Sequence, residues 1–191
     1  LKYRMDNLLD SFFIPELKKK YPHEISAGQS QRVCLARSII HNPDLLLLDE
    51  PFANLDQNLK EKVQENLKEI IKSSNITTIV VTHDKYEAFY LGDYCGILLN
   101  KKLIQFDSPY NIHHIPTSKE VVEFFNRGVL VPAVVMSENT LYNEELGEIK
   151  GKLMKNFQRG ENVKLLVQPE DLVHDDNSNL KFPVIDKKFR G

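Results

Sequence analysis

The sequence predicts an α/β fold with a parallel sheet, followed by a small all-β domain. The apolar runs at residues 45–48 and 76–81 lack the alternation of a solvent-facing strand, so we expect two buried strands, the first buried on both faces as in a parallel sheet. Amphipathic helical patterns lie between and around them. After Gly128 the pattern changes to short apolar or β-branched runs separated by stretches rich in Asn, Asp, Glu and Gly. We therefore expect two domains, residues 1–126 and 127–191.

Helix signals flank both predicted strands. Pro15 and Pro22 interrupt an amphipathic segment over residues 1–24, which predicts two short helices. Ser26, with Gln29 three residues later, has the capping-box pattern and predicts a helix from about residue 27 to 41. Apolar spacing predicts a surface helix over 57–72, and an Asp84 cap predicts another helix after the second strand. This order is typical of right-handed parallel crossovers.

Later segments predict a hairpin and a β-rich tail. Residues 96–106 predict a hairpin that turns near Asn100 and Lys101, and Thr117 with Glu120 predicts the start of a last helix that ends near residue 126. In the tail, strands are predicted at residues 129–136, 163–167 and 182–185.

Composition excludes several classes of protein. The longest apolar stretch, Val129 to Met136, has eight residues, far fewer than the ~20 that cross a bilayer, so we expect no membrane insertion. The 25 basic and 27 acidic residues give a net charge of −2 and no reason to expect nucleic acid as a partner. Cys34 and Cys95 match neither a CxxC site nor a disulfide framework, which predicts two buried thiols. The chain starts at Leu1 without a signal-peptide pattern, so we expect a fragment of a longer protein.

Acidic and histidine side chains follow the predicted strands. Asp49 and Glu50 come directly after the first strand, and ligands of open α/β sheets bind at such carboxyl ends. Asp49 is suited to hold Mg²⁺ through water, and Glu50 to deprotonate or orient a water that attacks a γ-phosphate. His83 follows the second strand and can reach the same phosphate. The alternative is that these residues only end strands in solvated turns.

A helix start forms a second polar feature. The segment from Ser26 to Gln29 opens a predicted helix, whose exposed N–H groups and dipole attract anions, and Gly28 allows close approach of a phosphate. The alternative is an ordinary capping box.

In order and spacing these segments resemble the ATP-binding subunit of ABC transporters. Residues 25–32 resemble its signature motif, residues 45–51 its Walker B motif with the catalytic glutamate, residues 54–56 its D-loop and His83 its switch histidine. The resemblance covers residues 1 to about 125 and implies a partial P-loop NTPase domain that uses ATP and Mg²⁺. It implies catalytic roles for Glu50 and His83 and a metal-binding role for Asp49. The residues it places at the nucleotide of a second copy are Ser26, Ala27, Gly28, Gln29 and Asp56.

The tail resembles that of one importer subgroup. Residues 168–172 resemble an RPEDL-type motif in the oligomer-binding-like regulatory barrel of importer ATPases, and residues 126–132 are most like the ferric-iron members. The resemblance implies a homodimer that binds membrane permease subunits at the cytoplasmic face of the inner (plasma) membrane and powers import of a small solute. The last residues resemble the middle of that barrel, so we expect the barrel to be incomplete.

Three departures from the family pattern matter. No GxxxxGK sequence followed by Ser or Thr occurs, because Leu146 stands where the pattern at Gly151 and Lys152 needs glycine. We therefore expect the 191-residue chain alone to bind ATP weakly and to be inactive, and the longer subunit to be the ATPase. Ala27 replaces the first signature glycine, which is harmless only within a helix, and Asn54 replaces the usual D-loop serine.

Two other functions stay open. One is a non-transport ATPase of DNA repair or chromosome maintenance, in which long coiled-coil insertions are expected. About 17 residues of periodic helix between Asp56 and Lys72 favour transport instead. The other is a regulatory or dimerisation module without activity.

Overall fold

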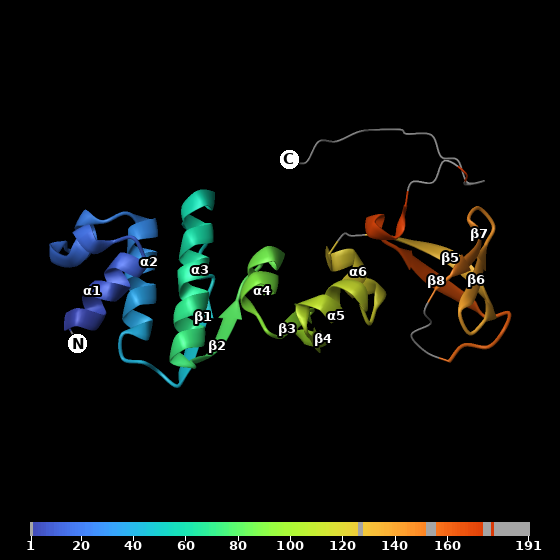
Figure 1. Ribbon diagram of the computed structural model, residues 1–191, viewed down its shortest axis with the longest axis horizontal. Coiled ribbons are helices and arrows are strands. Elements are labelled where there is room, and N and C mark those ends of the chain that lie inside the picture. The colour runs from blue at the N-terminus through green and yellow to red at the C-terminus, as the bar shows by residue number, and fades with distance from the viewer. Residues whose placement is uncertain (1, 126–127, 152–155, 174–176, 178–191) are drawn as a thin grey trace. The chain divides into compact units, whose positions relative to one another are not determined.

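The computed structural model describes residues 2–125, 128–151, 156–173 and 177, and the chain divides into two compact units (Figure 1). The first unit ends at Val121 and the second begins at Val122, both within helix α6 (Lys119–Phe125). The domain boundary expected from the sequence, between residues 126 and 127, lies close to this division. That these two units are separate domains stays a prediction.

The first unit is built on a parallel pair of strands. β1 (Leu45–Asp49) and β2 (Thr77–Val81) pair in parallel, with Leu45 opposite Thr77 and Asp49 opposite Val81. Helix α3 (Gln57–Ser74) connects the two strands. Asn75 ends α3 in the left-handed region at φ 52°, a conformation that Asn tolerates better than most residues. The α/β prediction with a parallel sheet is confirmed.

Three helices share one core with β1. α1 (Lys2–Ser11) is followed by two 3₁₀ turns, η1 (Pro15–Lys19) and η2 (Pro22–Glu24), and then by α2 (Ala27–Ile39). The helix predicted to end at residue 41 ends two residues earlier. Side chains from α1, η1, α2, α3 and β1 form this core together with Phe52 and Ile76. None of its buried residues comes from η2. The buried members are Leu8, Phe12, Ile14, Leu17, Leu35, Ala36, Ile39, Leu46, Leu48, Phe52, Val63, Leu67 and Ile76.

The parallel sheet is buried on one face, and the prediction that its first strand is buried on both faces is wrong. Leu46 and Leu48 point into the core and are 3% and 8% exposed, whereas Leu47 on the opposite face is 66% exposed. Ile79 and Val81 of β2 are also more than half exposed. A continuous apolar run is compatible with burial of both faces of a strand. Both faces are buried only where other helices or strands pack against each of them. Within the described part of the chain, the second face lacks that cover.

A helix and an antiparallel hairpin follow β2. α4 (Lys85–Leu91) starts at its predicted cap, because the Asp84 carboxylate accepts the backbone N–H groups of Tyr86 and Glu87. β3 (Cys95–Leu99) pairs with β4 (Lys102–Asp107). Asn100 and Lys101 both lie in the left-handed region, at φ 49° and 63°, as a tight hairpin turn of matching twist requires. The predicted hairpin and its turn are confirmed.

The structure corrects two further details of this unit. Helix α5 (Pro109–His114) was not predicted, although Ser108 caps it and Pro109 is well suited to a first helical position. The cap of α6 is Ser118, whose Oγ accepts the N–H of Val121 at 3.4 Å. Thr117, the predicted cap, instead donates its backbone N–H to Gln105.

The prediction of two buried thiols is half right. Cys95 is buried, and burial raises the pKa of its thiol. Cys34 is exposed on α2, on the side of that helix that does not face the core.

The second unit is a β-sheet unit. β5 (Val129–Ser137), β6 (Thr140–Asn143), β7 (Gly147–Lys150) and β8 (Asn162–Val167) form an antiparallel sheet in the order β7-β6-β5-β8. A 3₁₀ turn, η3 (Pro169–Asp171), follows β8. The predictions of strands at 129–136 and 163–167 are confirmed, and that of a strand at 182–185 lies outside the described residues. Closure of this sheet into a barrel stays a prediction.

No helix within the described ranges is both long and apolar enough to cross a membrane.

One buried arginine fastens α2 to the turn after α1. Arg32 is 8% exposed, and its guanidinium donates to the carbonyls of Phe12 and Phe13 at 3.1 and 2.7 Å. Phe13 has a φ of 56°, so these bonds hold a turn that is unfavourable for a bulky residue.

We expect Arg32→Met to lower the free energy of unfolding by about 1–3 kcal/mol, because both carbonyls lose a charged donor in a buried place. Urea unfolding followed by circular dichroism measures the loss. Arg37→Met, at an exposed position of the same helix, is the control and should change stability by less than about 0.5 kcal/mol. Equal effects of the two changes would contradict this role of Arg32.

Candidate active site

Parallel pairing brings the ends of β1 and β2 to one edge of the sheet. Asp49 pairs with Val81, and the backbone N–H of the next residue, Glu50, donates to the Val81 carbonyl at 2.9 Å. The chain therefore carries Glu50 and His83 past the same edge, where the sequence analysis expects an acid and a histidine to serve one ligand.

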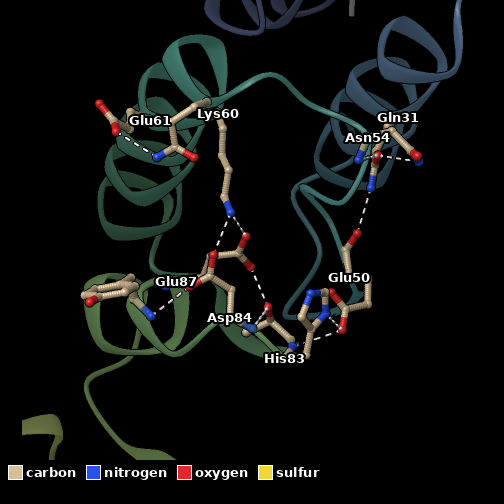
Figure 2. A network of polar contacts seen from close by, with 11 residues as sticks. Gln31, Glu50, Asn54, Lys60, Glu61, His83, Asp84 and Glu87 are labelled. Carbon is tan, nitrogen blue, oxygen red and sulfur yellow. Dashed lines mark hydrogen bonds and ion pairs between the residues drawn. The ribbon is translucent and has the colours of Figure 1, made fainter. Parts of the chain in front are cut away.

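Glu50 and His83 make a two-point contact (Figure 2). Oε1 of Glu50 accepts the backbone N–H of His83 at 3.0 Å and lies 2.8 Å from Nδ1 of its ring. The side chains of Glu50 and His83 are 37% and 82% exposed, so the pair is open to a ligand. The hydrogen bond that the Glu50 carboxylate accepts, together with the carboxylate charge, raises the pKa of His83 above the ordinary value.

The backbone of Glu50 is held in an unusual conformation. Its φ is 45°, in the left-handed region that costs an L-residue about 1–2 kcal/mol. Gln31 of α2 supports it: its Nε2 donates to the Glu50 carbonyl at 2.7 Å, and its Oε1 accepts the backbone N–H and Nδ2 of Asn54 at 3.1 and 3.0 Å (Figure 2). One amide thus links α2 to the loop between β1 and α3. Gln31 lies within the segment 25–32 that resembles the signature motif, and the sequence pattern carries no signal for this contact.

The start of α2 is a capping box. Ser26 Oγ accepts the N–H of Gln29 at 3.3 Å, and the Ser26 N–H donates to Gln29 Oε1 at 3.0 Å. Ala27 is the first residue of the helix, so helical φ accommodates the alanine that replaces a glycine. Each of the two polar side chains therefore accepts the backbone N–H of the other residue, whereas Glu50 and His83 contact each other beside Asp49 at the sheet edge.

Gly28 is needed for packing within the chain. A Cβ atom at this position would lie 2.6 Å from the carbonyl oxygen of Asn54, closer than side chains approach backbone oxygens. The sequence analysis gave close approach of a phosphate as the reason for this glycine. The structure supplies a second reason, which is contact between the α2 N-terminus and the loop that follows Glu50.

The two remaining predicted site residues lie at the ends of elements. Asp56 caps α3, since its Oδ1 accepts the Leu59 N–H at 3.1 Å. Asp49 is exposed at the end of β1 and lines a depression of 520 Å³ beside α2, together with Ala27 and Asn54. The depression is wide open to solvent. Among the residues that the structure describes, no group of three or more metal-ligating side chains occurs. A single exposed carboxylate fits Mg²⁺, which binds few protein ligands and keeps its water.

A charged cluster lies on the other side of His83. Lys60 of α3 ion-pairs with Asp84 and Glu87, and Glu87 is 4% exposed (Figure 2). The sequence pointed to Asp84 only as a helix cap, and it gave no signal for Lys60, because 24 residues separate Lys60 from Asp84.

Known proteins with similar sequences fall in one family. A family model described as ABC transporter matches residues 1–53. The Fe(3+) ions import ATP-binding protein FbpC of Haemophilus influenzae is 34% identical over 170 residues, which are 88% of this chain and 47% of that protein. The chain is similar to ATP-binding subunits of ABC importers.

Proteins named for the import of a different cargo are also similar to this chain. The spermidine/putrescine import ATP-binding protein PotA of Aster yellows witches'-broom phytoplasma is 37% identical over 156 residues, 82% of this chain and 37% of that protein. PotA of Mycoplasma genitalium is 30% identical over 190 residues, 98% of this chain and 34% of that protein. The chain thus spans about a third to a half of the relatives it matches.

We expect Gly28→Ala to destabilise the chain by about 1–3 kcal/mol, because the new methyl group must displace the Asn54 carbonyl. At other positions within a helix, Gly→Ala stabilises a protein by about 1 kcal/mol. The sign of the change in unfolding free energy therefore tells the two cases apart. Urea unfolding measures it, with Ser30→Ala on the same turn of α2 as the control. A more stable Gly28→Ala chain would show that the loop after Glu50 moves aside freely.

We expect Glu50→Gln to lower the pKa of His83, because the neutral amide no longer stabilises the imidazolium. NMR titration of the imidazole signals measures the change, and the signals of His41 provide the internal control. Since folding raises this pKa, the pair stabilises the folded chain below the histidine pKa of the unfolded chain, and this stabilisation is lost as pH rises through the folded value. A His83 pKa that is equal in both proteins would refute the ion pair.

Proposed function

We propose that the chain is part of an ATP-hydrolysing subunit that powers import of a small solute through a membrane permease. The observation that carries this proposal is the Glu50 and His83 pair at the carboxyl edge of a parallel sheet, next to Asp49. Similarity to import ATP-binding proteins over most of the chain supports it.

Each residue of the pair has a task that suits its surroundings. Glu50 acts as the general base, taking a proton from the water that attacks the γ-phosphate of ATP. His83 holds Glu50 in place and presents the far side of its exposed ring to the phosphate. Asp49 binds Mg²⁺ through water, and the bound metal offsets charge on the phosphates.

The nucleotide is bound between two copies in this proposal. Ser26, Ala27, Gly28 and Gln29 present the α2 N-terminus to ATP held by the phosphate-binding loop of the partner, and Asp56 lies beside the same interface. Backbone N–H groups at a helix start suit such an anion, even though the Ser26 and Gln29 side chains cap the helix in the single chain. The subunit works as a homodimer at the cytoplasmic face of the inner membrane.

The length of α3 argues against a DNA-repair or chromosome-maintenance ATPase. It has 18 residues and runs from its Asp56 cap to Asn75, after which β2 follows directly. A coiled-coil insertion would need a much longer heptad pattern between the two strands.

The cargo we propose is ferric iron, on the resemblance of residues 126–132 and the similarity to an Fe(3+) import protein. Polyamines are the second candidate, because several similar proteins carry spermidine/putrescine in their names. Uptake of each radiolabelled cargo by cells with and without the subunit distinguishes them.

In the longer subunit, we expect Glu50→Gln to lower the turnover of ATP about 10²- to 10⁴-fold, because the general base is lost. Binding of ATP should be retained, since Asp49 is intact and the side chain keeps its size. A phosphate-release assay measures turnover, and equilibrium titration measures binding. Glu61→Gln is the control, because it replaces an exposed carboxylate of α3 with the same amide. It should leave both turnover and binding of ATP unchanged. Turnover within about threefold of wild type for Glu50→Gln would rule out this role.

A further inference from the structure

A compact ionic cluster joins α3 to the segment that carries His83. Lys60 Nζ lies 2.7 Å from Asp84 Oδ2 and 2.6 Å from Glu87 Oε1. Thr82 Oγ1 donates to Glu87 Oε2 at 2.5 Å. Three elements therefore meet in one cluster: α3, the end of β2 and the start of α4 (Figure 2).

Two members of this cluster, Lys60 and Glu87, are largely shielded from water, and the side chain of Asp84 is 28% exposed. The side chains of Lys60 and Glu87 are 16% and 4% exposed. Burial lowers the pKa of Lys60, but its hydrogen bonds to Asp84 and Glu87 outweigh this effect and the net pKa is raised. Burial raises the pKa of Asp84, and the bonds from Lys60 and two backbone N–H groups more than reverse it. Lys60 and Asp84 are therefore charged at neutral pH, and removing Lys60 would leave the buried Glu87 side chain without its cationic partner.

The cluster fixes the residues on both sides of His83. Thr82 Oγ1 accepts the backbone N–H of Asp84 at 3.0 Å, in addition to its bond to Glu87. The Asp84 carboxylate accepts two N–H groups of α4 and binds Lys60. The His83 side chain is 82% exposed, and the structure shows its ring bonded to Glu50. Because few atoms pack around the ring, its direction depends on the backbone of Thr82 and Asp84.

We propose that Lys60 is a positioning residue for His83: by tying Asp84 and Glu87 to α3, it holds the segment 82–84 so that the imidazole meets the Glu50 carboxylate. Asp56, which ends the loop after Glu50, caps the same helix, so Lys60 also connects that loop to the His83 segment. The task of His83 in hydrolysis rests on the proposed function, but the positioning does not.

The positioning role and a simple charge effect of Lys60 predict opposite changes in the pKa of His83 when Lys60 is removed. The charged groups around His83 are Glu50 from the loop after β1, Asp84 and Glu87 from α4, and Lys60 from α3. If Lys60 acts on His83 only through its charge, Lys60→Met unmasks two carboxylates and the pKa of His83 rises. If Lys60 acts through position, the ring moves away from Glu50 and the pKa falls.

The experiment is an NMR titration of His83 in the 191-residue chain. We expect Lys60→Met to lower the pKa of His83 toward the value measured in Glu50→Gln, and Lys60→Arg to restore it. Lys68→Met is the matched control, because Lys68 also lies on α3 and contacts α4 through the Tyr90 carbonyl and ring, away from the His83 segment. It should leave the titration unchanged. An unchanged or raised pKa in Lys60→Met would overturn the proposal.

A second variant guards against loss of folding. In Lys60→Met with Glu87→Gln, the buried uncompensated charge is gone while the amide oxygen still accepts from Thr82. The pKa of His83 should again fall relative to Glu87→Gln alone, and no fall would overturn the proposal. Because the readout needs no ATP turnover, an inactive longer subunit with the expected titration would refute the proposed function and leave the positioning role standing.

Discussion

The candidate site depends on the parallel pairing of β1 with β2. In a parallel pair both strands end at the same edge, so residues 33 positions apart in the chain can meet just beyond Asp49 and Val81. A shift of the register by one residue would move Glu50 away from the Val81 carbonyl and from His83. The core residues Leu46 and Leu48 fix the register, because the same shift would turn them from the core toward solvent.

Features that depend on local sequence could be predicted. The start of α2 at Ser26, the cap of α4 at Asp84 and the hairpin turn at Asn100 follow from side chains within three residues of the backbone they serve. The strands of the parallel pair were predictable because β-branched and apolar runs of that length favour buried strands. Both carboxyl-edge groups, Glu50 and His83, followed from the strand predictions alone.

Features that depend on contacts between distant segments could not be predicted. The exposure of Leu47 depends on what covers the sheet, which a strand pattern cannot report. The need for glycine at position 28 comes from the Asn54 carbonyl, and the role of Lys60 comes from carboxylates 24 and 27 residues later in the chain. The strands β6 and β7 are short and half polar, so their alternation was too weak to separate from a loop.

The left-handed backbone of Glu50 has a consequence for how this position evolves. Glycine would adopt a φ of 45° without strain, whereas a glutamate is held there by the Val81 carbonyl, the Gln31 amide and His83. Selection for stability alone would therefore drift toward glycine or asparagine at this position. Glycine here would relieve the backbone strain and at the same time remove the carboxylate that accepts the His83 N–H, so the turn and the contact to His83 make opposite demands on this position.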